Sequence, residues 1–184
     1  MPSILGLDLS KRSAGFALWN GEADKPVAGT WTLGSELTPA GAAFVKLHRN
    51  LHDLWTVSPF DIVIYEEPLN LGPHAGFTNK DTIFTLMGLA THVDSFCEAV
   101  GVRKYCCVNQ SSWRRHFIGS MRRGTKTPDL KAFAMARCRQ LGMRPEKHDA
   151  AEAIGILSYM CAMEGIIPPW EKDDVLRVPL EGRG

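Results

Sequence analysis

One short apolar run limits the fold of this chain more than any other feature of the sequence: DIVIY, residues 61–65. The run is strongly β-prone, and it stops at Glu66-Glu67-Pro68. A strand with apolar residues on both faces is typical of a sheet that has neither face in water. We therefore expect helices on both faces of the sheet, which places the chain in the α/β class.

Hydrophobic periodicity and turn residues predict the elements around this strand. The predicted strands are residues 3–9, 14–19, 27–33, 61–65 and 104–108. The predicted helices begin at Thr38-Pro39, cover 81–100, begin at Ser111 or Ser112, and cover about 127–141 and 147–163. This order predicts a mixed five-stranded sheet. We expect residues 1–164 to form one domain and residues 165–184 a peripheral tail.

The composition fits an ordinary globular protein. The chain has 184 residues, of which 45% are hydrophobic and 22% charged. The opening MPSILGLDLS lacks a basic region followed by a long apolar run, so we expect no signal peptide, and no apolar segment is long enough to suggest a membrane partner. The five cysteines form no CxxC pair, which predicts buried free thiols and a reducing, cytoplasmic location.

Two acids lie at the ends of predicted strands. Asp8 is part of the apolar strand ILGLDL, where alternation places it on one face with Ile4 and Gly6. Glu66 follows DIVIY and shares a face with Ile62 and Ile64. Each acid also has a simpler explanation, because Asp8 could pair with Lys11 or Arg12 and Glu66 could be a solvated strand end. If the two strands are neighbours, the two carboxylates meet at one end of the sheet.

Two more acids begin the last predicted helix. Asp149 and Glu152 are three residues apart in HDAAEAIGIL, so they lie on one helix face. They could cap the helix, since an acid followed three residues later by Glu is close to a capping box. They could also join Asp8 and Glu66. Four carboxylates that close together would raise one another's pKa unless a cation offsets their charge, and oxygen ligands suit Mg²⁺ or Mn²⁺.

The charge of the chain is unevenly distributed, although its net value is only +1. Residues 101–147 hold twelve Lys or Arg against two acids, a net charge of +10, and the rest of the chain carries −9. Such asymmetry is typical of a protein that binds phosphates through one region. The alternative is a solvated basic helix face with a charged loop.

Three stretches of the sequence, in this order, resemble the acidic motifs of RuvC-type Holliday junction resolvases, which have the ribonuclease-H-like fold: GLDLSKRSAGFALW, IVIYEEPL and HDAAEAIGIL. The resemblance covers about residues 3–163. It implies a homodimeric, Mg²⁺-dependent endonuclease that resolves four-way DNA junctions by paired nicks in recombination and repair, with two ions per site and Mn²⁺ as a substitute. It also implies that the catalytic and metal-binding residues are Asp8, Glu66, Asp149 and Glu152. Glu152 is a departure, because the fourth position is more often Asp.

The resemblance gives other residues an expected role on DNA. Phe77 could stack on bases at the junction centre or simply anchor a loop in the core. His148 could assist proton transfer or be an ordinary residue of the helix start. Trp113 could face DNA, although its spacing to Phe117 favours the core. We expect the dimer to use the apolar face of helix 81–100, and the expected DNA-binding residues besides Phe77 are Arg114, Arg115, Arg122, Arg123, Lys126 and Lys131.

Other functions remain open on the sequence alone. A nuclease of the same fold could act on flaps, other branched DNA or RNA–DNA hybrids. A protein that binds branched DNA without cutting it would gain nothing from four acids. Sugar kinases and actin-like ATPases also open with an acid-bearing strand and a polar turn, but they need glycine-rich phosphate loops, and we find none in the sequence.

Overall fold

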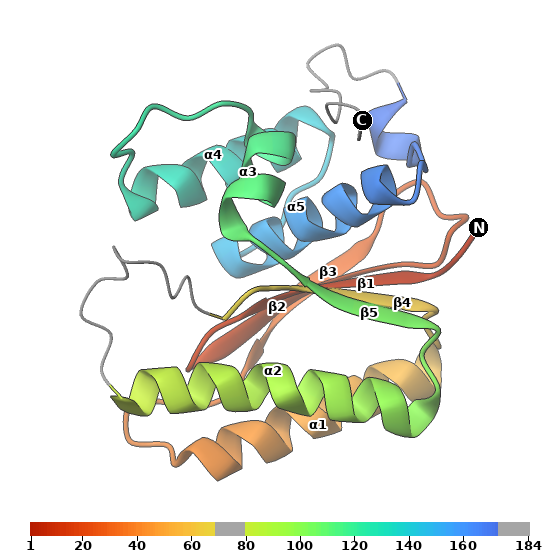
Figure 1. The fold of residues 1–184 in the computed structure, drawn as a ribbon. Coiled ribbons are helices and arrows are strands. Elements are labelled where there is room, and N and C mark those ends of the chain that lie inside the picture. The colour runs from red at the N-terminus through yellow and green to blue at the C-terminus, as the bar shows by residue number, and fades with distance from the viewer. Residues whose placement is uncertain (69–79, 173–184) are drawn as a thin grey trace, which may run out of the picture.

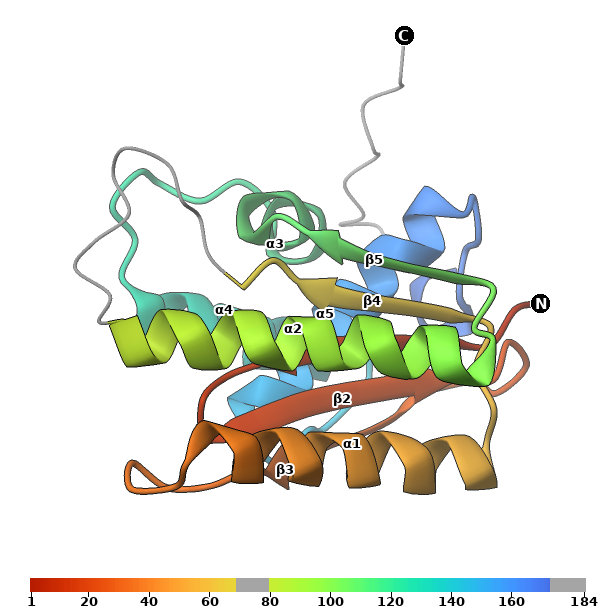
Figure 2. The ribbon, with the colours of Figure 1, turned by 60° about the horizontal axis from the view of Figure 1, so that its bottom comes forward.

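A five-stranded sheet lies between two layers of helices in the computed structural model, which describes residues 1–68 and 80–172 (Figure 1). Helices α1 (Ala40–Val57) and α2 (Lys80–Val100) cover one face of the sheet. The other face carries α3 (Gln110–Ile118), α4 (Thr127–Gln140) and α5 (His148–Met163). Figure 2 shows α1 and α2 running side by side in front of the strands. The predicted α/β class and the two covered faces are confirmed.

The strands form a mixed sheet in the order β3-β2-β1-β4-β5. Their bounds are Ile4–Leu9 for β1, Ser13–Trp19 for β2, Val27–Thr32 for β3, Ile62–Glu66 for β4 and Lys104–Val108 for β5. The first three are antiparallel neighbours, whereas β4 runs parallel to both β1 and β5. The apolar strand of DIVIY is therefore inside the sheet, and Ile62 through Tyr65 are all buried.

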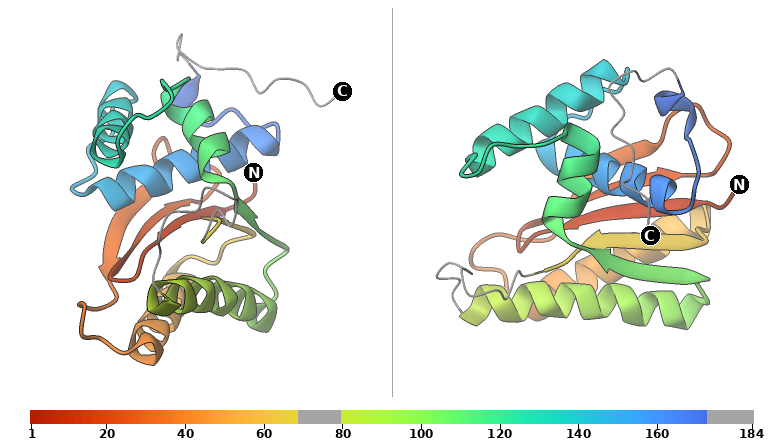
Figure 3. Two further views of the ribbon diagram at one scale, coloured as in Figure 1. Left: turned by 60° about the vertical axis from the view of Figure 1, so that its left-hand side comes forward. Right: turned by 45° about the horizontal axis from the view of Figure 1, so that its top comes forward.

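The core has two layers, one on each side of the sheet. Ile4, Ile62 and Ile64 pack against α3, α4 and α5, and Leu5, Leu7 and Val63 pack against α1 and α2. This alternation confirms that Asp8 and Glu66, which continue the first set, point toward the face that α5 covers. The two views of Figure 3 show α5 lying across the strands on that face.

Three expectations from the sequence need correction. The start of α3 is capped by Asn109, whose side chain accepts from the Ser111 amide, and not by Ser111 or Ser112. Residues 165–172 are not simply peripheral, because Trp170 is buried and packs edge-on against Trp19 at 5.4 Å, and residues 173–184 lie outside the described part of the chain. All five cysteines are free as expected, but Cys107 is exposed, since β5 is an edge strand.

The apolar stripe expected to form a dimer interface belongs largely to the core. Ala90 and Val93 of α2 are buried in the layer that α1 and α2 form with the sheet. The large exposed apolar residues of α2 are Phe84, which is outside the stripe, and Met87, which belongs to it, at 64% and 45% exposure. The stripe Ile83, Met87, Ala90 and Val93 therefore cannot act as one interface.

Within residues 1–68 and 80–172, no helix is both long enough and apolar enough to span a bilayer.

Two glycines let α5 approach the sheet closely. A Cβ on Gly6 of β1 would lie 2.7 Å from the carbonyl oxygen of Ala153, and one on Gly15 of β2 would lie 2.0 Å from that of Asp149. Real Cβ atoms do not approach a backbone that closely. Because these positions lack a side chain, the first turns of α5 rest almost on the strands. That contact brings the acids of α5 to the acid of β1.

Candidate functional site

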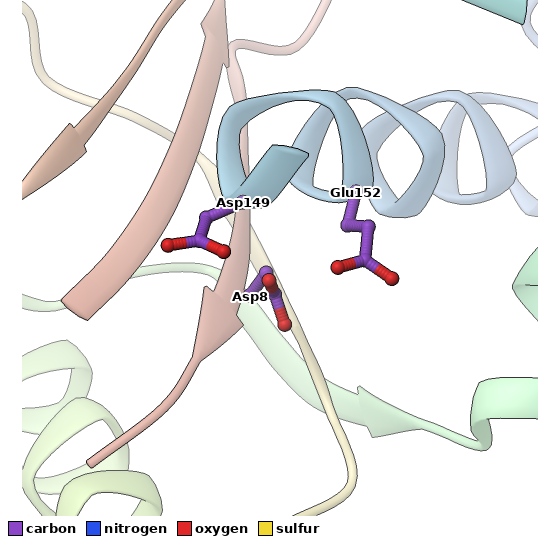
Figure 4. A group of neighbouring side chains, drawn as sticks. All are labelled: Asp8, Asp149 and Glu152. Atoms are coloured by element: carbon purple, nitrogen blue, oxygen red, sulfur yellow. The ribbon is translucent and has the colours of Figure 1, made fainter. Parts of the chain in front are cut away.

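Three of the four predicted acids converge where β1 ends beneath the start of α5. Asp8, Asp149 and Glu152 each offer one carboxylate oxygen, and these oxygens all lie within 4.8 Å of one another. Figure 4 shows Asp149 and Glu152 reaching down from α5 toward Asp8. Asp149 and Glu152 are buried, and Asp8 is partly buried. The prediction that these acids lie together is confirmed for these three residues.

The fourth acid, Glu66, lines the same cleft but is held by other side chains. Its Oε1 accepts a 2.6 Å hydrogen bond from Gln110 Nε2, and its Oε2 accepts a 2.7 Å bond from the indole nitrogen of Trp113. Glu66 is therefore not a solvated strand end. Burial raises the pKa of Glu66, while the Trp113 bond and the Arg114 charge act in the opposite direction. The structure thus separates Glu66 from the tight group of three, although it stands close enough to influence Asp8.

The electrostatics of the site centre on Asp8. The pKa of Asp8 lies well above its usual range. Burial is the largest cause, and repulsion by Glu152, Glu66 and Asp149 raises the pKa further. Lys131 acts in the opposite direction. The alternative pairing of Asp8 with Arg12 does not occur, because Arg12 pairs with Glu36. A cation that neutralises this group would relieve the repulsion.

The donor set fits a hard divalent cation. All three converging side chains offer oxygen, and oxygen ligands on opposite sides of one Mg²⁺ are about 4 Å apart. The oxygens of Asp8, Asp149 and Glu152 are within 4.8 Å of one another, so small side-chain movements are enough to bring them to one ion. The pKa of Asp8 is raised because its negative charge is buried beside other acids, and a bound cation would offset that charge. These residues therefore fit Mg²⁺ or Mn²⁺.

The acids of α5 do not cap their helix. The N-cap residue is Lys147, and it makes no side-chain capping bond. Asp149 instead accepts a 2.7 Å bond from the hydroxyl of Ser13 in β2, and His148 Nε2 lies 3.0 Å from its other oxygen. The explanation of Asp149 and Glu152 as a capping box is therefore wrong. Asp149 is oriented by a strand residue 136 positions away in the sequence.

The acids open into a cleft of about 720 Å³ whose rim is basic. Its lining includes Lys11, Arg12, Lys131 and Lys147, besides the acids and His148. Lys131 Nζ lies 4.0 Å from Asp149. A cleft with acids at its floor and cations at its rim has the charge pattern that a phosphate group over a metal site requires.

The other residues predicted to contact DNA have different surroundings. Arg122, Arg123 and Lys126 are exposed in the segment between α3 and α4, and exposed Arg115 lines a neighbouring pocket. Arg114 differs, because its side chain is mostly buried and donates a 2.6 Å bond to Glu152, although it also lines the cleft that holds the acids. Phe77 lies outside the described residues.

Sequence reasoning missed the residues that orient the acids. Ser13, Gln110, Trp113 and Arg114 each donate to one of them from another element. No local pattern identifies such donors, because their partners are 38 to 136 positions away. The two strand glycines, Gly6 and Gly15, carried a weak signal, since glycine inside a strand indicates a close backbone approach.

Comparisons with known proteins identify the fold. No family model matches the sequence, and no curated protein matches it. Among solved structures, Thermus thermophilus RuvC superposes with a TM-score of 0.63 at 16% identity over 89% of this chain and 96% of that chain. T. thermophilus RuvC in complex with a Holliday junction substrate gives 0.62 at 14% identity, covering 86% and 92% of the two chains. The yeast mitochondrial Holliday junction resolvase Ydc2 gives 0.53 at 10% identity, covering 85% and 77%. This chain therefore has the ribonuclease-H-like fold of the RuvC resolvases.

Proposed function

We propose that this protein is a metal-dependent endonuclease that resolves four-way DNA junctions by paired nicks. The observation that carries the proposal is the group formed by Asp8, Asp149 and Glu152 at the floor of a basic-rimmed cleft. The fold adds support, because T. thermophilus RuvC, which shares it, has been solved with a Holliday junction substrate. A site for phosphate binding alone would have no use for clustered carboxylates.

Each residue of the site has a role in this proposal. Asp8, Asp149 and Glu152 would hold Mg²⁺ or Mn²⁺. Glu66, the fourth acid of the proposed metal site, lines the same cleft. When bound, two such ions stabilise the attacking and leaving oxygens of phosphodiester cleavage. Lys131, at 4.0 Å from Asp149, is placed to bind a phosphate oxygen over the acids. His148 is exposed and its Nε2 lies 3.0 Å from Asp149 as a donor, so its other ring nitrogen, Nδ1, can hold a water or accept its proton.

The proposed enzyme is a homodimer. A four-way junction has two strands to cut, and a two-fold dimer supplies two symmetric active sites. Phe84 and Met87, exposed on α2, are apolar surface that such an interface would bury. Light scattering on the protein with a bound junction tests this part, because a monomer at micromolar concentration contradicts it.

One cleavage assay tests the activity directly. Synthetic four-way junction, duplex, flap and RNA–DNA hybrid substrates are compared with Mg²⁺ and with a chelator. We expect paired nicks in the junction only, and only with Mg²⁺. Preferred cutting of the flap or hybrid would assign the site to another nuclease of the same fold, and metal-independent binding without cutting would make the protein a branched-DNA-binding protein.

The metal should stabilise the protein more as the pH rises. The folded protein without metal holds a proton on Asp8 more tightly than the unfolded chain does, because the pKa of Asp8 is raised. The resulting stability is present below the ordinary Asp value of about 4 and is lost as the pH rises through the raised value. Mg²⁺ replaces that proton. We expect the difference in melting temperature between Mg²⁺ and chelator to grow from pH 5 to pH 8, and a constant difference contradicts the site.

The loop between α3 and α4 should supply much of the affinity for DNA. Arg122 and Arg123 are exposed beside Gly124, so they can reach phosphates without breaking internal contacts. Changing both to Ala should weaken junction binding across sequences and flatten the slope of log affinity against log salt by about one to two units. The melting temperature should not change, since exposed charges contribute little to folding. Unchanged affinity and slope would place the DNA path elsewhere.

A further inference from the structure

Helix α3 presents three donors to the acids of the site. Gln110, Trp113 and Arg114 are spaced i, i+3 and i+4, so they share one face of the helix. The first two bond both oxygens of Glu66, and Arg114 Nη2 donates to Oε1 of Glu152 at 2.6 Å. One helix thus holds two acids that come from β4 and α5.

The bond between Arg114 and Glu152 is a fixed part of the interior. The two side chains are only 11% and 3% exposed. The guanidinium also lies 5.1 Å from the ring of Trp113, which is itself buried and tied to Glu66. Charge-assisted bonds of this length are strong, and burial protects them from screening by salt. Arg114 is therefore held in place on both sides and does not swing like a surface arginine.

This bond engages only one of the two carboxylate oxygens of Glu152. Across residues 1–68 and 80–172, Arg114 supplies the single hydrogen bond to this carboxylate, and it goes to Oε1. A metal ion that also bound Oε1 would compete with the guanidinium for it. A carboxylate oxygen has two lone pairs, so Oε1 can still be shared, but a cation that binds both oxygens of Glu152 has to share Oε1 with the positive guanidinium, whereas one that binds Oε2 alone does not.

The number of oxygens that a carboxylate donates distinguishes divalent cations. Mg²⁺ requires a near-octahedral set of six ligands at about 2.1 Å, whereas Ca²⁺ takes six to eight and often binds both oxygens of one carboxylate. We infer that Arg114 is a positioning residue that restricts Glu152 to one oxygen and so makes the site select Mg²⁺ over Ca²⁺. The inference deepens the proposed function and rests on the acids of that site binding a metal.

Calorimetry on the metal-free protein without DNA tests the inference. Arg114→Met removes the guanidinium and keeps an apolar side chain over Trp113. Loss of a positive charge strengthens the binding of every divalent cation, but this effect is the same for Mg²⁺ and Ca²⁺ and cancels in the ratio of their affinities. We expect the ratio of Ca²⁺ to Mg²⁺ affinity to rise about tenfold. Loss of a hydrogen-bond partner of a metal ligand typically changes metal affinity by about ten- to a hundredfold, and we take the lower end of that range.

The controls separate this role from a general effect on structure. Arg49→Met, the same change at an exposed site on α1, should leave the ratio unchanged. Arg114→Gln, which is too short to reach Glu152, should shift the ratio as Arg114→Met does and serves if that variant fails to fold. In a Glu152→Ala background the Arg114 effect should disappear, because Arg114 then has no carboxylate to restrict.

Three results would overturn the inference: no binding of divalent cations by the wild-type protein, an unchanged ratio in a folded Arg114 variant, or a shift that persists in the Glu152→Ala background. Its failure is distinct from failure of the proposed function. A protein that shows the expected metal selectivity but does not cut junctions would contradict the nuclease and leave the role of Arg114 intact.

Discussion

Asp8→Asn is expected to reduce junction nicking by about a thousandfold or more while junction binding stays close to that of the wild type. The variant removes one carboxylate from the group of three and changes no basic residue on the rim of the cleft. Metal ions contribute several kcal/mol to the stabilisation of such a transition state, and each 1.4 kcal/mol corresponds to about tenfold in rate. Single-turnover cleavage and a binding titration on the same labelled junction measure the two effects separately.

The same substitution should make the metal-free protein more stable. Asp8 is the acid whose ionised form suffers most from burial and from its three acidic neighbours, and Asn carries no charge to be repelled. We expect a higher melting temperature in chelator and little further rise with Mg²⁺. Asp53→Asn, at an exposed position on α1, is the matched control and should change neither activity nor stability. Full nicking by Asp8→Asn would remove this residue from the site.

Gly15→Ala is expected to lower nicking about a hundredfold although residue 15 bears no functional group. The new Cβ would lie 2.0 Å from the carbonyl oxygen of Asp149 and 2.4 Å from its carbonyl carbon. These are backbone atoms of α5 that no side-chain rotation can move, so α5 must move away from β2. Asp149 and Glu152 are in the first turns of α5 and move with it. A displacement of about 1 Å from the reactive geometry can cost a hundredfold in rate. Overpacking should also cost about 1–3 kcal/mol of stability, which thermal melts will show.

The matched control is Gly41→Ala on α1. A Cβ at Gly41 meets nothing within 4 Å, and Ala is the better helix former. This variant should keep full activity and gain up to about 1 kcal/mol in stability. Equal behaviour of the two alanine variants would show that the close approach of α5 to the sheet does not position the acids.

The order and type of the elements could be predicted from the sequence. The DIVIY strand, the alternation around Asp8 and the helical spacing of Asp149 and Glu152 are local patterns, and each records which side of an element is buried. The boundaries of β5, α4 and α5 came out at or within a residue of the expected positions. The face shared by Asp8 and Glu66 also followed, because β-strand alternation is fixed along the chain.

Local patterns failed where a residue's role depends on a distant partner. Arg114 reads as one of twelve basic residues in a DNA-binding region, yet it is buried against Glu152, 38 positions away. The stripe on α2 reads as an interface, yet Ala90 and Val93 face the sheet and α1. A periodic apolar face shows that something covers a helix, and it does not show whether the cover is the same chain or another.

The sequence by itself determined which carboxylates face one side of one sheet, because side-chain direction follows from the period of each element. Only the tertiary structure decided that three of them meet and the fourth is held apart. That outcome depends on two glycines that let α5 lie against β1 and β2, and on donors from β2 and α3 that orient Asp149, Glu66 and Glu152. Such contacts join residues far apart in the chain, and they exist only once packing has brought their elements together.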